Sequence, residues 1–305
     1  MPILTCIFKI FHNFFISRIN LLGTFMTYNE FNNRIFELQN YGLEIFTIGQ
    51  STLNRSIYGT HVGSFSGAQI IIQGGMHARE YISSLLVIEL AKMYANTPST
   101  SGGIYFIFCT NPDGLALVLD GADSLPCAVT QNYLITINGG ADFSLWKANA
   151  NAVDLNTNFN ADWGSGAQNV SCPASENFIG FYAESEREVR VLTNFTKKNR
   201  IKLSISYHSK GEVIYYGFNG ESEADLERDR VLGEQFATAT GYRLMLTQNS
   251  AGGYKDWCVR ELKIPAYTFE LGREELSHPI GEEYLNEIVE QNKQVPQIAL
   301  DYVRS

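Results

Sequence analysis

A histidine and a glutamate stand three positions apart, as His77 and Glu80, within the stretch IIIQGGMHAREYIS (residues 70–83). An apolar run and two glycines precede them, and an apolar helical pattern begins directly after them. A catalytic zinc ion commonly takes two histidine nitrogens and one carboxylate, and keeps its fourth position for water. An isolated pair of this kind is more often only a polar helix start, so a zinc site here requires a third ligand elsewhere.

The third ligand that the sequence favours is His208, in the stretch SISYHSKG. It ends a predicted strand, and open α/β sheets bind ligands beyond the carboxyl ends of their strands. His77 and Glu80 also follow a predicted strand, so the three side chains can meet in one crevice. The other histidines lie in the leader, in a glycine-flanked loop and before a proline in the tail, at His12, His61 and His278. The alternative for His208 is a hydrogen-bonded surface residue.

A further carboxylate, Glu270, closes the otherwise apolar strand pattern PAYTFEL (residues 265–271). An ionised carboxylate at such a position is costly unless it is paired or has a chemical role. It could act as a general base that takes a proton from a water molecule during attack on a carbonyl. The structural alternative is an ion pair with Arg273 or Lys263.

The elements that would position these residues alternate between strand and helix patterns, which is typical of a layered α/β fold. Short apolar runs predict strands at 68–73 and 103–108, the alternating pattern KLSISY predicts one at 202–207, and PAYTFEL predicts one at 265–271. Helical patterns cover 81–95, 184–199 and 224–241, the last of them ending at Gly241. The tail from 281 to 304 is predicted to be helical, with Pro296 marking a break or kink.

Composition limits the class of protein and its partners. The chain has 305 residues, of which 45% are hydrophobic and 18% charged, so one large catalytic domain over residues 26–305 is the simplest expectation. Its formal net charge of -9 does not favour nucleic acid as a partner. The five cysteines are widely spaced and odd in number, which fits a reducing compartment better than an oxidising one.

Residues 1–25 form an apolar leader of uncertain role. Polar residues interrupt each long apolar run, so we expect no transmembrane span. The leader has no basic start and no A-x-A cleavage site, which argues against a secretory signal. The simplest interpretation is an upstream translation start, with Met26 opening the folded chain, and the alternative is an amphipathic anchor for peripheral membrane association.

These segments together resemble the zinc metallocarboxypeptidase superfamily, whose pancreatic members remove C-terminal residues from peptides. GGMHARE is similar to its H-x-x-E zinc motif, YHSKG to its third-ligand strand and TFELG to the strand that carries its general base. Further landmarks are NPDG (111–114), VDLNTNF (153–159) and SAGGYKDW (250–257). The resemblance implies a three-layer αβα sandwich around a mixed eight-stranded sheet. It also implies one Zn²⁺ on His77, Glu80 and His208, with Glu270 as the base.

The chain departs from the digestive enzymes at residues that contact substrate. Asn156 and Thr157 stand where those enzymes have Asn-Arg, and a threonine hydroxyl can donate one neutral hydrogen bond but cannot form an arginine fork on a terminal carboxylate. By the same resemblance, Lys147 takes the place of the arginine that polarises the scissile carbonyl, so the positive charge is kept.

The remaining candidates would form a basic substrate-binding face. Gln248 stands where the digestive enzymes have a mobile tyrosine, and Tyr254 is a candidate to take over that role. Lys255 occupies the position that sets side-chain preference, where a lysine suits an acidic side chain. Lys210 and Arg79 would add positive charge to the same face, and the alternative for each basic residue is a solvated surface side chain.

Within the superfamily, LWKANANAVDLNTNF and YHSKGEVIYYGF resemble the bacterial γ-D-glutamyl-diamino acid endopeptidases and murein peptide amidases. That resemblance implies a peptidoglycan-derived stem peptide as substrate, cut between D-glutamate and diaminopimelate or lysine. Because no export signal is recognised, turnover of imported fragments in the cytoplasm is the expectation. The alternatives are a conventional metallocarboxypeptidase, which would require a C-terminal carboxylate beside the cleaved bond, and a non-catalytic zinc-dependent peptide-binding protein.

Overall fold

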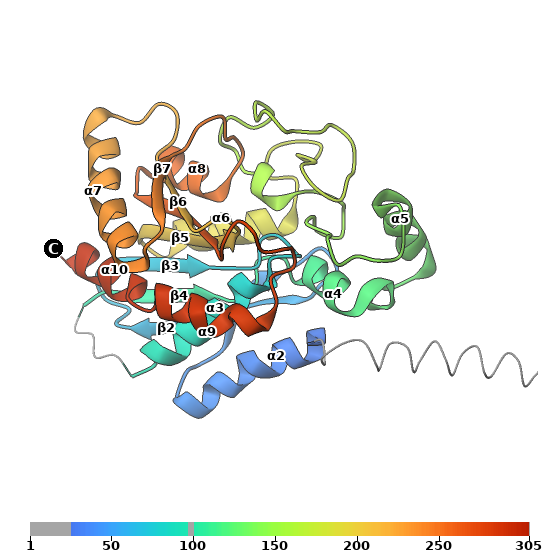
Figure 1. The fold of residues 1–305 in the computed structure, drawn as a ribbon, viewed down its shortest axis with the longest axis horizontal. Coiled ribbons are helices and arrows are strands. Elements are labelled where there is room, and N and C mark those ends of the chain that lie inside the picture. Colours follow the sequence, from blue (N-terminus) through green and yellow to red (C-terminus); the bar gives the residue numbers. More distant parts are fainter. Residues whose placement is uncertain (1–25, 97–100, 305) are drawn as a thin grey trace, which may run out of the picture.

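An eight-stranded mixed sheet forms the middle layer of the protein, in a computed structural model that describes residues 26–96 and 101–304 (Figure 1). The strand order is β1-β2-β4-β3-β5-β8-β6-β7. The strands are β1 Phe46–Gln50, β2 Ser56–Gly63, β3 Gln69–Gln73, β4 Gly103–Ile107, β5 Ile201–Ser209, β6 Val213–Tyr216, β7 Arg243–Leu246 and β8 Ala266–Leu271. The central strands β4, β3, β5 and β8 run parallel, whereas β1, β2 and β6 pair antiparallel with a neighbour.

Helices cover both faces of this sheet. Figure 1 shows α3, α9 and α10 in front of the strands and α6 behind them. The helices are α2 Tyr28–Glu37, α3 Tyr81–Tyr94, α4 Pro112–Asp120, α5 Ala128–Asn138, α6 Arg187–Lys198, α7 Glu223–Thr240, α8 Tyr254–Trp257, α9 Leu285–Asn292 and α10 Val295–Arg304. The predicted three-layer α/β sandwich with a mixed eight-stranded sheet is confirmed.

The sheet separates two hydrophobic cores, which explains the run of isoleucines in its central strand β3. In β3, Ile70 and Ile72 pack into the core beneath α3, α7, α9 and α10. Ile71, between them, packs into the second core with residues of α6 and α8. A strand buried on both faces needs an apolar residue at every position, because successive side chains point to opposite sides. This is the pattern from which the strand was predicted.

The predicted elements agree with the observed ones to within a few residues. The helix expected at 81–95 is α3, the one expected at 184–199 is α6, and the one expected at 224–241 is α7, which ends at Gly241 in a left-handed conformation. The helical tail is divided by a turn at Lys293 and Gln294, and Pro296 lies in the first turn of α10. The predicted break is therefore present, just before the proline.

Two expectations concern the environment of the chain. Within the described residues, no helix is long and apolar enough to cross a bilayer. Cys109, Cys127, Cys172 and Cys258 are free thiols in the structure. The expectations for the leader, including Cys6, lie outside the described residues, although Met26 is the first residue described and is buried.

Candidate functional site

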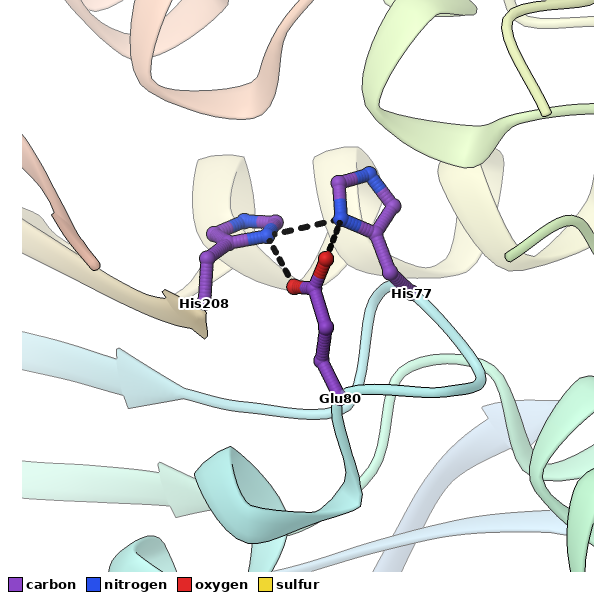
Figure 2. Close-up of side chains that lie close together, drawn as sticks. All are labelled: His77, Glu80 and His208. Atoms are coloured by element: carbon purple, nitrogen blue, oxygen red, sulfur yellow. Dashed lines mark hydrogen bonds and ion pairs between the residues drawn. The ribbon is translucent and has the colours of Figure 1, made fainter. Parts of the chain in front are cut away.

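His77, Glu80 and His208 converge at the carboxyl ends of the central strands (Figure 2). His77 lies on the loop after β3, Glu80 directly precedes α3, and His208 lies near the end of β5. Nδ1 of His77 is 2.9 Å from Oε1 of Glu80 and 3.0 Å from Nδ1 of His208. Nδ1 of His208 is 3.1 Å from Oε2 of Glu80. The structure thus brings together the three residues that the sequence proposed as ligands.

The donor set and its spacing fit a tetrahedral metal ion. Zinc bonds of about 2.0–2.2 Å would separate neighbouring ligand atoms by about 3.3–3.6 Å, so the three side chains, now 2.9–3.1 Å apart, would need to move apart only slightly around an ion. Two imidazole nitrogens that both present lone pairs repel one another, whereas a cation between them would bind both. All three side chains are almost completely buried, which makes a shared cation a better explanation than exposed polar contacts.

The charges around the cluster favour the metal-binding protonation states of Glu80 and His208, whereas those around His77 favour its protonated form, which a metal ion would have to displace. Burial alone would raise the pKa of Glu80, but His77 and His208 hold it well below its ordinary value, so the carboxylate stays ionised. Burial and the neighbouring His77 lower the pKa of His208 and favour the neutral imidazole. Burial opposes protonation of His77 too, yet Glu80 and Asp154 together raise its pKa. A carboxylate and neutral imidazoles are the forms that bind zinc.

Asp154 is a functional candidate that the sequence analysis did not assign. Its Oδ1 lies 3.1 Å from Nε2 of His77, and its Oδ2 lies 2.9 Å from Nζ of Lys147. The carboxylate is fully buried, and Lys147 and His77 keep its pKa well below the usual range despite burial. A carboxylate on the outer nitrogen of a histidine fixes the tautomer, so that Nδ1 of His77 is free for metal. The available signal was the lone acid in AVDLN, within an otherwise apolar or amide-rich stretch.

Glu270 lies beside His208 because β5 and β8 run parallel and the two residues are paired in register. Parallel strands in register point paired side chains to the same face of the sheet. Burial and the nearby Glu80 carboxylate raise the pKa of Glu270 to about 8, against the opposite influence of His77 and Lys147. The alternative ion pair is absent among the described residues, since Arg273 pairs instead with Glu287 and no contact with Lys263 is found.

A pocket of about 280 Å³ opens next to Glu270. Its lining residues are Asn156, Tyr215, Thr247, Gln248, Asn249, Ser250, Lys255, Thr268 and Glu270. Asn156, Gln248 and Lys255 were all proposed from the sequence as substrate-binding residues. Next to this pocket, the loop at Gly252 packs closely against the loop at Thr157. Gly252 has a φ of +76°, and a side chain there would lie 2.4 Å from the carbonyl oxygen of Thr157. Only glycine allows this close approach of the two loops.

Two proposed substrate contacts differ from the expectation. Tyr254 is fully buried, packs against Trp257 and Phe159, and shares a hydrogen bond with Thr196, so it faces the core beneath α6 rather than the pocket. The hydroxyl of Thr157 donates to the carbonyl oxygen of Asp154 within a short 3-10 turn. The hydroxyl groups of both side chains therefore have partners within the protein, and only Tyr254 is fully buried.

The basic candidates already have acidic partners. Nζ of Lys255 donates to the carbonyl oxygen of Gly217 at 2.7 Å and to Oδ1 of Asp256 at 2.5 Å. Lys210 contacts the carboxylate and main-chain oxygen of Glu274. Arg79 lies 3.1 Å from Glu176. Of these three basic residues, only Lys255 lines the pocket.

Comparison with known proteins identifies the same family as the sequence motifs. A family model described as zinc carboxypeptidase matches residues 38–295. Gamma-D-glutamyl-L-diamino acid endopeptidase 1 of Lysinibacillus sphaericus is 30% identical over 251 residues, which are 77% of this chain and 62% of that protein. Carboxypeptidase A1 of Bos taurus is 29% identical over 248 residues, 73% of this chain and 56% of that protein. The chain thus spans about three fifths of the length of these relatives.

Solved structures agree on the fold. Bovine thrombin-activatable fibrinolysis inhibitor superposes with a TM-score of 0.74 at 23% identity, over 92% of this chain and 98% of that one. Murein-tripeptide amidase of Escherichia coli O157 gives a TM-score of 0.55 at 21% identity, over 83% of this chain and 91% of that one. At these identities, the likeness establishes a shared fold.

Proposed function

The chain belongs to the zinc carboxypeptidase family, and from this premise we propose that it hydrolyses the γ-D-glutamyl–diamino acid amide bond of peptidoglycan stem peptides. The single observation that carries the proposal is the convergence of His77, Glu80 and His208 beside Glu270 and a pocket that contains Lys255. The similarity to a γ-D-glutamyl-L-diamino acid endopeptidase supports this choice of bond.

His77, Glu80 and His208 would hold one zinc ion. A zinc ion there would supply a Lewis acid for the scissile carbonyl and lower the pKa of a bound water molecule. Glu270 would accept the proton of the attacking water at its carboxylate and pass it to the leaving amine.

Lys147 would stabilise the negative charge that develops on the carbonyl oxygen. Burial disfavours its charged form, but Asp154 and Glu80 raise its pKa above the ordinary value, so the ammonium group stays charged. Asp154 holds this ammonium at 2.9 Å and orients His77 with its other oxygen. A fixed positive charge is effective in such a site because it needs no reorganisation during the reaction.

The pocket suits a leaving group with an acidic side chain. The ammonium group of Lys255 has three hydrogens, and the described residues accept two of them. The third can bind a carboxylate, such as the one at the end of the diaminopimelate side chain. Asp256 offsets part of the charge, so we expect the discrimination to be nearer the lower end of about 1.5–3 kcal/mol for a hydrogen bond to a charged group. The free thiols of the described cysteines support turnover of imported fragments in the cytoplasm.

Mass spectrometry of defined peptides after incubation with the zinc-loaded protein tests this proposal. We expect L-Ala-γ-D-Glu-meso-diaminopimelate to be cleaved at the γ-glutamyl bond, and the lysine analogue to be cleaved more slowly. Lys255→Ala should reduce this preference by about tenfold, since about 1.4 kcal/mol corresponds to a factor of ten. A preference for C-terminal residues of ordinary α-peptides would instead identify a conventional carboxypeptidase, and binding without turnover of any amide would identify a peptide-binding protein.

A further inference from the structure

Arg79 presents a guanidinium group next to the metal cluster, immediately before Glu80 in the chain. One terminal nitrogen, Nη1, donates to the carbonyl oxygen of Leu145 at 3.1 Å, which fixes the group independently of any acid. The other, Nη2, lies 3.1 Å from Oε2 of Glu176. The guanidinium acts electrostatically on Lys147 and His278, and its side chain is 20% exposed, so it lies at the rim of the site; it does not line the pocket that holds Lys255.

Glu176 is brought to this position by a rigid backbone. The carbonyl oxygen of Ser175, the preceding residue, accepts hydrogen bonds from the amides of Lys147 and Ala148. The amide of Asn177, the following residue, donates to Oδ2 of Asp154 at 3.1 Å. The backbone that carries Glu176 is therefore anchored to the same residues that orient His77. The side chain of Glu176, in contrast, is 45% exposed.

The pair between Arg79 and Glu176 is one of two exposed ion pairs near the site, the other being Lys210 with Glu274. The acidic partners of Lys147 and Lys255 have side chains that are 0% and 1% exposed, so removing them from their lysines would leave charges buried. In contrast, the Arg79 and Glu176 side chains are 20% and 45% exposed, and surface pairs of this kind contribute little to stability. A second carboxylate can therefore replace Glu176 on the guanidinium at small cost.

We propose that Glu176 is a built-in competitor for Arg79, and that the free α-carboxylate of the γ-linked D-glutamate displaces it when substrate binds. This inference rests on the proposed function and names the substrate group that Arg79 recognises. In a γ-glutamyl amide, the free carboxylate is four bonds from the scissile carbonyl carbon, a reach of roughly 5 Å. An ordinary α-peptide has no carboxylate at this point unless a side chain provides one.

Displacement of Glu176 gives selectivity at a small cost in affinity. A carboxylate can form two parallel hydrogen bonds with a guanidinium group, whereas a carboxamide or a peptide carbonyl offers one neutral acceptor. Only a group that binds Arg79 better than Glu176 does will gain from the exchange. Substrates without this carboxylate leave the ion pair between Arg79 and Glu176 intact, and the side chain of Glu176 stays at the rim of the site.

The test measures binding of the product dipeptide L-Ala-γ-D-Glu and of its α-carboxamide counterpart L-Ala-D-isoglutamine by calorimetry. Glu176→Gln should bind the carboxylate dipeptide about two- to fivefold more tightly, because the competing exposed pair is gone. Arg79→Gln should weaken the same binding by about tenfold, and Glu176→Gln added to Arg79→Gln should change nothing further. Binding of the carboxamide dipeptide should change by less than about twofold in both single variants.

Two matched controls separate this effect from a general change of charge. Glu227→Gln removes the same charge from another exposed arginine–glutamate pair, with Arg230 on α7, and should leave binding of both dipeptides unchanged. Glu274→Gln removes the acidic partner of Lys210 instead, and binding of both dipeptides should again be unchanged. An effect of Glu274→Gln in place of Glu176→Gln would overturn the proposal, because Lys210 would then be the carboxylate-binding residue. Equal effects on the two dipeptides, or no binding of the carboxylate dipeptide, would overturn it as well.

Turnover measurements distinguish failure of this inference from failure of the proposed function. For a cleaved γ-glutamyl substrate, Glu176→Gln should lower KM and leave kcat unchanged, since it alters binding that persists in the transition state. Arginine-dependent binding of the dipeptide without cleavage of any γ-glutamyl bond would reject the proposed reaction and retain the exchange. Cleavage with no difference between wild type and Glu176→Gln would retain the reaction and reject the exchange.

Discussion

Replacing Asp154 by asparagine tests how far one buried carboxylate controls the candidate metal site. Asp154 accepts from Nε2 of His77 with one oxygen and pairs with Nζ of Lys147 through the other, at 3.1 and 2.9 Å. An asparagine has only one acceptor oxygen, so its amide group must face either the histidine N–H or the lysine ammonium. One of the two donors then loses its partner, whichever way the side chain turns.

The expected magnitudes follow from these two contacts. Loss of a group that orients a ligating histidine typically lowers metal affinity by about 10- to 100-fold, or about 1.4–2.8 kcal/mol. Breaking a buried ion pair costs about 3–5 kcal/mol of folding stability. The side chain of Lys147 is 17% exposed and can be partly hydrated, so we expect a loss of about 2–3 kcal/mol in the free energy of unfolding.

The assay is zinc competition against a chelator, together with urea unfolding of the metal-free protein. Asp113→Asn is the matched control, because Asp113 is also fully buried and pairs with Arg55 at 2.9 Å, but it has no contact with the metal cluster. It should lose comparable stability and keep its zinc affinity. If Asp154→Asn binds zinc as tightly as this control does, Asp154 has only a structural role and the reasoning is refuted.

The remaining predictions concern the base and the dependence of stability on pH. Glu270→Gln should keep zinc but lose turnover by several orders of magnitude, because the amide cannot accept a proton. Near-normal hydrolysis by this variant would point to another base. His208→Ala should lose the metal, which metal analysis of the purified variant would show. Burial raises the pKa of Glu188 from 4.5 to about 7, so the folded state binds this proton more tightly than the unfolded chain does. Its contribution to stability should therefore fall as pH rises from about 4.5 to about 7, by about 3 kcal/mol in total. Urea unfolding between these pH values should show a smaller loss in the free energy of unfolding for Glu188→Gln than for the wild type. If the two proteins lose the same free energy over this range, Glu188 is not the titrating group.

The sequence predicted best those elements whose environment is uniform. β3 and β8 are largely buried and could be recognised as apolar runs, and β5 could be recognised by its alternating pattern. The edge strands β1 and β7 are partly exposed and carry polar or small residues, so no single pattern identified them. The eight strands were expected only from the resemblance to a family.

The site was predictable where chemistry is tied to spacing along the chain. His77 and Glu80 are three residues apart, and His208 and Glu270 each lie near the end of a predicted strand. Asp154 and Glu176 escaped notice because they lie between α5 and α6, in a segment with little regular structure, where position depends on tertiary hydrogen bonds. The buried orientation of Tyr254 was equally inaccessible, since family spacing gives a position in the chain but no direction for the side chain.

The register between β5 and β8 has a consequence for how activity is lost under stress. His208 and Glu270 sit opposite each other on adjacent central strands, and their backbone hydrogen bonds belong to the part of a fold that opens only on global unfolding. Glu176 lies on the connecting segment between α5 and α6, where smaller openings occur more often, whereas Arg79 shares its loop with the candidate ligands His77 and Glu80. As denaturant is added, amide exchange around Glu176 should accelerate well before exchange in β5 and β8. Preference among substrates would therefore deteriorate before the ability to cleave them does.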